Sequence, residues 1–128
     1  MGDGRSRGSH VLLDYTNYTS PVENEGVWML ELMRASVRAS RIREVHSHVE
    51  VFDGVLSPPG FAAVVLIDES HVTAHCYTDS GLLAIDVFTC GSHDPQDVAM
   101  LIHEGLVSEV EGIVLASRER IDRFVESD

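Results

Sequence analysis

Basic residues are scarce in this sequence of 128 residues, which has 9 lysine and arginine residues against 21 aspartate and glutamate residues. The formal net charge is therefore −12. Most surfaces of such a protein would repel a phosphate backbone, so we expect no nucleic-acid partner. The same acidity favours solubility and suits a cationic small molecule.

Long apolar runs and cysteines are also few. No apolar segment reaches the roughly 18 residues of a membrane-spanning helix, so we expect no membrane span. No long apolar stretch follows the arginines near the N-terminus, so we expect no secretory signal. Cys76 and Cys90 could form one disulfide, but nothing else indicates secretion, and we predict reduced thiols in a cytoplasmic protein.

The composition that remains is typical of a globular protein. Apolar residues make up 44% and charged residues 23%, which predicts one domain over residues 1–128 with a modest core. A domain of this size leaves little room for a deep pocket of its own. Small enzymes often build their sites across a dimer interface, so we expect a homodimer.

Apolar periodicity predicts an α+β fold. In the first predicted helix, Trp28, Leu32 and Ala35 fall on one face, and Asp94 with Pro95 is a typical start for the second. The segment "FAAVVLID" (61–68) predicts a buried strand with no polar face. The predicted strands are 9–16, 44–52, 61–68, 71–77, 82–89 and 112–119; the predicted helices are 25–43 and 96–106, and a short terminal helix is left open. This order predicts a two-layer sandwich, a mostly antiparallel β-sheet with helices packed on one face.

The stretch "LIDESHVTAHCY" (66–77) crowds reactive side chains into the middle of the chain. His71 and His75 would share a face on a helix, but alternation here indicates a strand, in which four residues span about 13 Å. Zinc–nitrogen bonds of about 2 Å cannot bridge that distance. His46 and His48 could share a metal, but no third ligand is evident, so we predict no metal site and an exposed polar strand face.

Nucleophilic chemistry at Ser70 is an alternative with limited support. A serine, a histidine and an acid are all present, but no G-x-S-x-G motif surrounds Ser70. Cys90 stands before a glycine in a predicted loop, where a thiol is more accessible than in a core. The residues alone leave two interpretations open: a catalytic pairing of Ser70 with Cys90, or a plain strand end and an ordinary cysteine.

Four segments together resemble a known family. They are "GSHVLLD" (8–14), "LSPPG" (56–60), "VVLIDESHVTAH" (64–75) and "GLLAIDVFTCG" (81–91), in this order over most of the chain. The sequence is similar to the small prokaryotic S-adenosylmethionine decarboxylase proenzymes, which depend on a pyruvoyl group. The resemblance implies decarboxylation of S-adenosylmethionine to the aminopropyl donor used in spermidine and polyamine biosynthesis.

The resemblance also implies a role for several residues. The proenzyme would cut itself between Glu69 and Ser70, giving a β chain of residues 1–69 and an α chain of residues 70–128. Ser70 would become the covalent pyruvoyl cofactor, whose ketone forms a Schiff base with the substrate amine. His75 would assist processing, and Cys90 would return a proton to the substrate carbon. We expect His71 to lie near the site.

The sequence departs from the family pattern in its substrate region. Leu56 stands where an aromatic residue often stacks on the adenine, and Ala62 stands where a small polar residue is expected. These changes leave arginine or ornithine decarboxylation open as the alternative activity. Ser70 and His75 also have opposite strand parity, which leads us to predict that residues 68–70 lie outside the regular strand.

Overall fold

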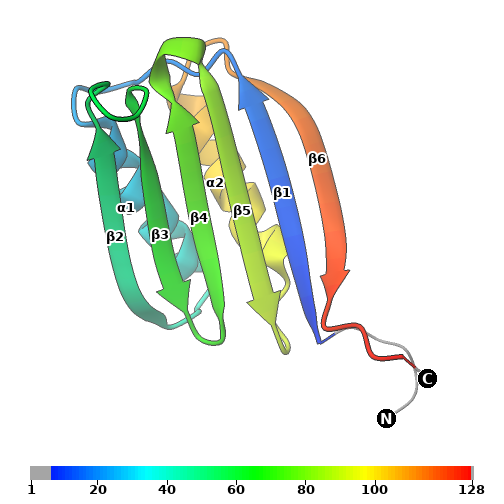
Figure 1. Cartoon of the computed structure of the whole chain (residues 1–128). Coiled ribbons are helices and arrows are strands. Elements are labelled where there is room, and N and C mark those ends of the chain that lie inside the picture. The colour runs from blue at the N-terminus through cyan, green and yellow to red at the C-terminus, as the bar shows by residue number, and fades with distance from the viewer. Residues whose placement is uncertain (1–6, 128) are drawn as a thin grey trace.

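A six-stranded antiparallel sheet is the main element of the computed structural model, which describes residues 7–127 (Figure 1). Both helices lie against one face of this sheet, and the other face is open (Figure 1). In chain order the elements are β1 Gly8–Thr16, α1 Glu25–Ala39, β2 Glu44–Phe52, β3 Gly60–Ile67, β4 Ser70–Tyr77, a 3₁₀ turn η1 Thr78–Ser80, β5 Leu82–Cys90, α2 Pro95–Glu109 and β6 Val114–Arg123. The strand order β2-β3-β4-β5-β1-β6 confirms the predicted two-layer α+β fold.

The core lies between the helices and the sheet. Met29 and Met33 of α1 and Ile102 of α2 are fully buried there against alternate residues of the strands. The helices begin as predicted but end differently. The first was expected to reach residue 43, yet α1 ends at Ala39, because Arg41 takes a left-handed backbone with φ of 60° that a helix cannot continue.

The strand β3 corrects the expectation of a fully buried strand. Every second residue packs under the helices, but Leu66 on the other side is 43% exposed. The residues on the open face are Ala62, Val64 and Leu66. An apolar run on both sides is typical of a strand covered on both faces, whereas this chain covers one.

Several strand boundaries also differ from the prediction, and β5 includes Cys90, which was expected in the following loop. Residues 68–70 were expected outside the regular strand, but Ser70 pairs with Ile67, so β4 begins at Ser70 and the turn contains only Asp68 and Glu69. The last strand was predicted to stop at residue 119, with a short helix left open. Instead β6 continues to Arg123, because it pairs with β1 along its whole length.

Within residues 7–127, no helix is long and apolar enough to cross a bilayer. Cys76 and Cys90 form no disulfide. Residues 1–6, part of the N-terminal stretch that was expected to hold no secretory signal, lie outside the described residues.

Candidate active site

The turn between β3 and β4 holds an unusual backbone. Glu69 has a φ of 58°, a left-handed conformation that glutamate rarely adopts. Arg43, directly before the start of β2, holds the turn: its Nε and Nη2 donate to Asp68 Oδ1 at 2.9 and 2.6 Å, and its carbonyl accepts from Asp68 N. These hydrogen bonds and the positive charge hold the pKa of the Asp68 carboxyl below its usual value. Arg43 therefore holds Asp68, the residue that begins the turn leading to the Glu69–Ser70 peptide bond.

The hydroxyl of Ser70 is the second unusual group. Its Oγ is buried and has no hydrogen-bond partner within the described part of the chain. A buried hydroxyl without a partner is costly, since it has lost its water and gained nothing in exchange. Such an atom in a native structure calls for an explanation, and reactivity is one.

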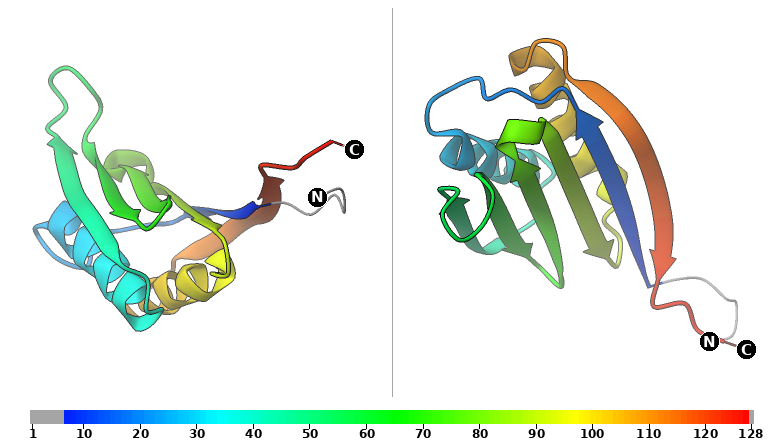
Figure 2. Two further views of the ribbon diagram at one scale, coloured as in Figure 1. Left: turned by 90° about the horizontal axis from the view of Figure 1, so that it is seen from below. Right: turned by 45° about the horizontal axis from the view of Figure 1, so that its top comes forward.

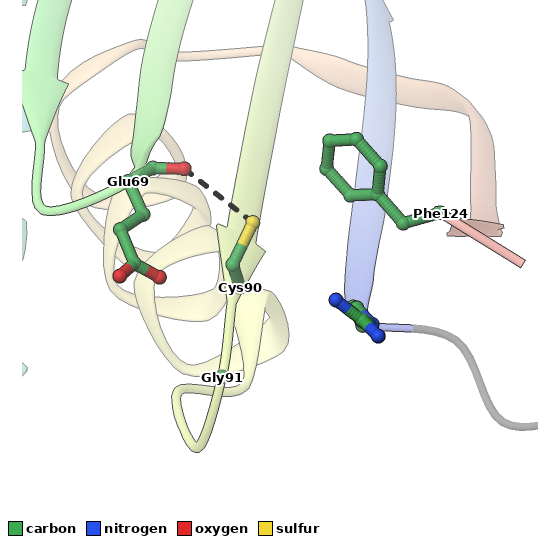
Figure 3. Close-up of a pocket in the computed structure, with 5 residues that line it drawn as sticks. Glu69, Cys90, Gly91 and Phe124 are labelled. Carbon is green, nitrogen blue, oxygen red and sulfur yellow. Dashed lines mark hydrogen bonds between the residues drawn. The ribbon is translucent and has the colours of Figure 1, made fainter. Parts of the chain in front are cut away.

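Cys90 lies beside the same peptide bond. The thiol at the end of β5 donates a hydrogen bond to the carbonyl oxygen of Glu69, with Sγ and O 3.4 Å apart (Figure 3). Both residues line a cavity of about 620 Å³, together with Arg7, Gly91 and Phe124. The structure therefore places the Cys90 thiol against the carbonyl of Glu69, the residue directly before Ser70.

His71 follows Ser70 and points to the open face of the sheet. Its ring contacts Phe88 and His10, with ring centroids 5.4 and 5.9 Å away. Burial lowers the pKa of His71, and the neighbouring His10 acts in the same direction, so this ring is neutral at neutral pH. His10 also lies 3.6 Å from Asp86, whose other oxygen accepts from Thr73. Sequence reasoning missed His10 and Asp86, although strand alternation places both on the open face.

His75 and Leu56 lie elsewhere in the same chain. His75 is five residues beyond Ser70 on β4, roughly 17 Å along the strand and on the opposite face of the sheet. It lines a separate hollow of about 370 Å³ with Ser57 and Pro58 of the β2–β3 loop. Leu56, in the same loop, is 99% exposed, and the loop projects from the sheet away from both helices (Figure 2). Within one copy, neither residue reaches Ser70.

No metal centre is evident in residues 7–127, where no three histidine, cysteine or acidic side chains gather closely enough to hold an ion. His48 instead lies 3.1 Å from Glu50 on the exposed strand β2. Cys76 is a core residue, since burial raises the pKa of its thiol to about 11 and keeps it protonated. The thiol available for chemistry is thus Cys90.

Two cavity residues could not have been found from the sequence. Phe124 follows β6, where the sequence shows no apolar alternation, and Arg7 precedes β1. They reach the cavity because β6 pairs with β1 and because Gly91 N donates to the Arg7 carbonyl at 3.1 Å. Pairing between distant parts of the chain therefore brings them to Cys90.

The fold and this site define a small two-layer α+β enzyme domain. The sequence profile described as S-adenosylmethionine decarboxylase matches residues 9–119. The chain therefore belongs to the S-adenosylmethionine decarboxylase family.

Curated relatives agree with this assignment. S-adenosylmethionine decarboxylase proenzyme 1 of Bacillus anthracis is 35% identical over 102 residues, which cover 77% of this chain and 74% of the relative. The proenzyme of Caldanaerobacter subterraneus subsp. tengcongensis is 32% identical over 105 residues, covering 80% of each chain. The crystal structure of the adenosylmethionine decarboxylase from Aquifex aeolicus shares the fold, with a TM-score of 0.73, 22% identity and coverage of 97% of this chain and 96% of that one.

Proposed function

We propose that this protein is a proenzyme that cuts itself between Glu69 and Ser70 and then decarboxylates S-adenosylmethionine with a pyruvoyl group derived from Ser70. The observation that carries the proposal is the Cys90 thiol hydrogen-bonded to the Glu69 carbonyl, next to a buried serine hydroxyl with no partner. The family match and the relatives' names support S-adenosylmethionine as the substrate and give no support to arginine or ornithine. We expect the reaction in the cytoplasm, where both thiols stay reduced.

The cutting reaction starts with attack on the chain itself. Ser70 Oγ adds to the carbonyl carbon of Glu69, and the Cys90 thiol hydrogen-bonds to the carbonyl oxygen as negative charge develops on it. The C–N bond then breaks, so the amide becomes an ester and the nitrogen of residue 70 becomes an amine. The left-handed backbone at Glu69 favours this uphill step, because leaving the amide releases the local strain.

Elimination and hydrolysis complete the cut. A base, which we assign to His75, removes the Cα proton of residue 70, and the Glu69 carboxylate leaves as the new C-terminus of the β chain. The remaining dehydroalanine takes up water and releases ammonia, which leaves a pyruvoyl group at the start of the α chain.

The site fits such a group. Ser70 Oγ makes no hydrogen bond that conversion would sacrifice, and Cys90 faces the cavity beside residue 69. When formed, the pyruvoyl group supplies a ketone that binds the substrate amine and accepts the electrons released with carbon dioxide. Cys90 then gives its proton to the substrate carbon, and the neutral His71 ring lines the approach from the open face.

The active form is proposed to be a homodimer joined through the open sheet face. Large apolar side chains are exposed on that face, although an uncovered sheet face is normally polar. They are Phe52, Leu66, Tyr77, Leu82 and Ile121. The double-sided apolar pattern of β3 has the same explanation, since a second copy would cover its open side.

A two-fold arrangement would also bring the missing residues to the site. The β2–β3 loop and the end of β4, which carry Leu56 and His75, lie toward one end of the sheet, and the β3–β4 turn and the end of β5 lie at the other end (Figure 1). Ser70 and Cys90 are the residues at that other end. In such a dimer the two open sheet faces would lie against each other, and the two-fold axis would run between them, perpendicular to the strands. Each end of one sheet would then lie over the opposite end of the partner's sheet. His75 and Leu56 of one copy would then serve the Ser70 of the other.

The test combines intact mass with turnover. Denaturing mass spectrometry of the purified protein should show two chains split after Glu69, the second carrying a pyruvoyl in place of Ser70. Release of carbon dioxide should follow addition of S-adenosylmethionine and not of arginine or ornithine. A folded chain that stays whole and turns over none of the three would overturn the proposal, and turnover of an amino acid alone would overturn the substrate.

The Arg43–Asp68 pair should set the rate of the cut. Arg43→Met keeps the apolar stem but removes the donors that hold the turn, so the Glu69–Ser70 bond is expected to break about two- to fivefold more slowly. The fraction of cut chain is followed over time by gel electrophoresis after synthesis. Arg34→Met is the matched control, because it breaks an ion pair with Glu44 and leaves the contacts of Arg43 with Asp68 in place. Equal rates for both variants and the wild type would show that the turn does not depend on Arg43.

A further inference from the structure

Phe124 is the aromatic residue of the cavity that contains Cys90. It follows the last residue of β6, has a left-handed backbone with φ of 55°, and its side chain is 63% exposed (Figure 3). A large aromatic residue in this conformation is a true outlier, since bulky residues avoid it. An exposed ring held by an unfavourable backbone beside a reactive thiol calls for a functional reason.

Contacts on either side of Phe124 in the structure fix the segment that carries it. Glu126 accepts a hydrogen bond from Arg7 Nε at 2.8 Å, and the Arg7 carbonyl in turn accepts from Gly91, the residue after Cys90. On its inner side the Phe124 ring contacts Phe88, with centroids 6.0 Å apart and planes at 45°. Residues 124–127, here called the C-terminal strap, are thus linked through Arg7 to Gly91, the residue after Cys90.

The remaining lining of the cavity has no aromatic and no large apolar side chain. Arg7 and Glu69 are charged, Gly91 has no side chain, and Cys90 is the thiol to which the proposed function assigns proton donation. A cavity of about 620 Å³ is in the range for a small ligand, and such sites usually combine apolar or aromatic walls with a few polar groups. Phe124 is the wall that this cavity offers to an aromatic group.

We propose that Phe124 is a positioning residue on which the adenine of the substrate stacks while Cys90 lies at the carbon that loses carbon dioxide. This proposal rests on the proposed function for the identity of the substrate. Adenine has a π face that stacks on aromatic side chains, and the exposed face of the ring is free to receive it. The C-terminal strap would therefore select an adenosyl compound over a plain cationic amino acid.

The test separates aromatic stacking from apolar area and from the positive charge of the sulfonium. Phe124→Ala, Phe124→Leu and Phe124→Tyr are compared by KM and kcat for S-adenosylmethionine. Each variant is also compared by its Kd for 5′-methylthioadenosine, which has the adenine but neither the charge nor the reacting carbon. We expect the Ala and Leu variants to raise KM and Kd by roughly tenfold to a hundredfold with kcat nearly unchanged, and Tyr to restore both. Val125→Ala, an equally exposed neighbour that does not line this cavity, should change neither constant.

Three results would overturn the proposal. KM and Kd within twofold of the wild type for Phe124→Ala would show that the ring contributes no binding. Wild-type constants for Phe124→Leu would show that apolar area is sufficient and that stacking is not required. A raised KM for S-adenosylmethionine with an unchanged Kd for 5′-methylthioadenosine would place the ring against the sulfonium instead. The intact mass of the wild type and of each variant reports cutting after Glu69 separately. An uncut wild type would show that the proposed function fails. The binding of 5′-methylthioadenosine would still test the role of Phe124 in that case.

Discussion

Ser70→Ala is expected to leave the protein as one uncut chain of 14.1 kDa and to abolish decarboxylation. The alanine has no hydroxyl to attack the Glu69 carbonyl, so neither the ester nor the pyruvoyl group can form. Denaturing mass spectrometry after long incubation measures the first result, and release of carbon dioxide from S-adenosylmethionine measures the second. Ser80→Ala, in the η1 turn, is the matched control and should be cut like the wild type.

The same variant should fold at least as well as the wild-type proenzyme. Ser70 Oγ is buried without a hydrogen-bond partner, so its removal relieves an unsatisfied polar group and leaves no donor or acceptor behind. Comparison is made with uncut wild-type chain, and the free energy of unfolding of Ser70→Ala should be equal or slightly higher. A variant that is still split after Glu69 would refute the role of Ser70. A clear loss of stability would instead show that the hydroxyl has a structural partner.

Local patterns were enough to predict most of the fold. Strand alternation and the turn residues around 78–81 predict the β4–β5 hairpin, and the Asp94–Pro95 start predicts α2. The end of α1 was harder, because no residue in 40–43 is a strong helix breaker. The left-handed Arg41 belongs to a helix cap in which Arg41 N and Ile42 N donate to the carbonyls of Arg38 and Val37. The β6 strand shows no apolar period at all, since every one of its residues is exposed, and only its pairing with β1 explains it.

The candidate site was predicted in part for the same reason. Glu69, Ser70 and Cys90 come together because an antiparallel hairpin brings the start of β4 to the end of β5, and the predicted strands imply this. Residues 68–70 were expected outside the strand because a regular strand places Ser70 and His75 on opposite faces of the sheet, whereas a joint role within one chain requires them on the same face. The structure keeps Ser70 in the strand and places the two side chains on opposite faces, as their sequence parity predicts. A role for His75 at Ser70 therefore requires the proposed second copy of the chain.

Hybrid dimers provide the most direct test of a site shared between two copies. His75→Ala alone and Ser70→Ala alone are each expected to stay uncut. In a hybrid dimer, however, the intact Ser70 of the His75→Ala chain meets the intact His75 of the Ser70→Ala chain. Co-expression in equal amounts should therefore restore cutting in about half of the His75→Ala chains, the share expected in hybrids of a two-fold dimer that mixes at random.

The two variants differ in mass, so the spectrum identifies which chain is cut. Only fragments of the His75→Ala chain should appear, because the Ser70→Ala chain lacks the nucleophile in every pairing. His48→Ala, another open-face histidine with no assigned role, should be cut equally with or without a partner variant. If the His75→Ala chain stays whole in the mixture although hybrids are present, or if it cuts itself at the normal rate alone, His75 does not act across the dimer. Rescue confined to the mixture would explain why His75 lies on the open face, roughly 17 Å along the strand from the Ser70 of its own chain.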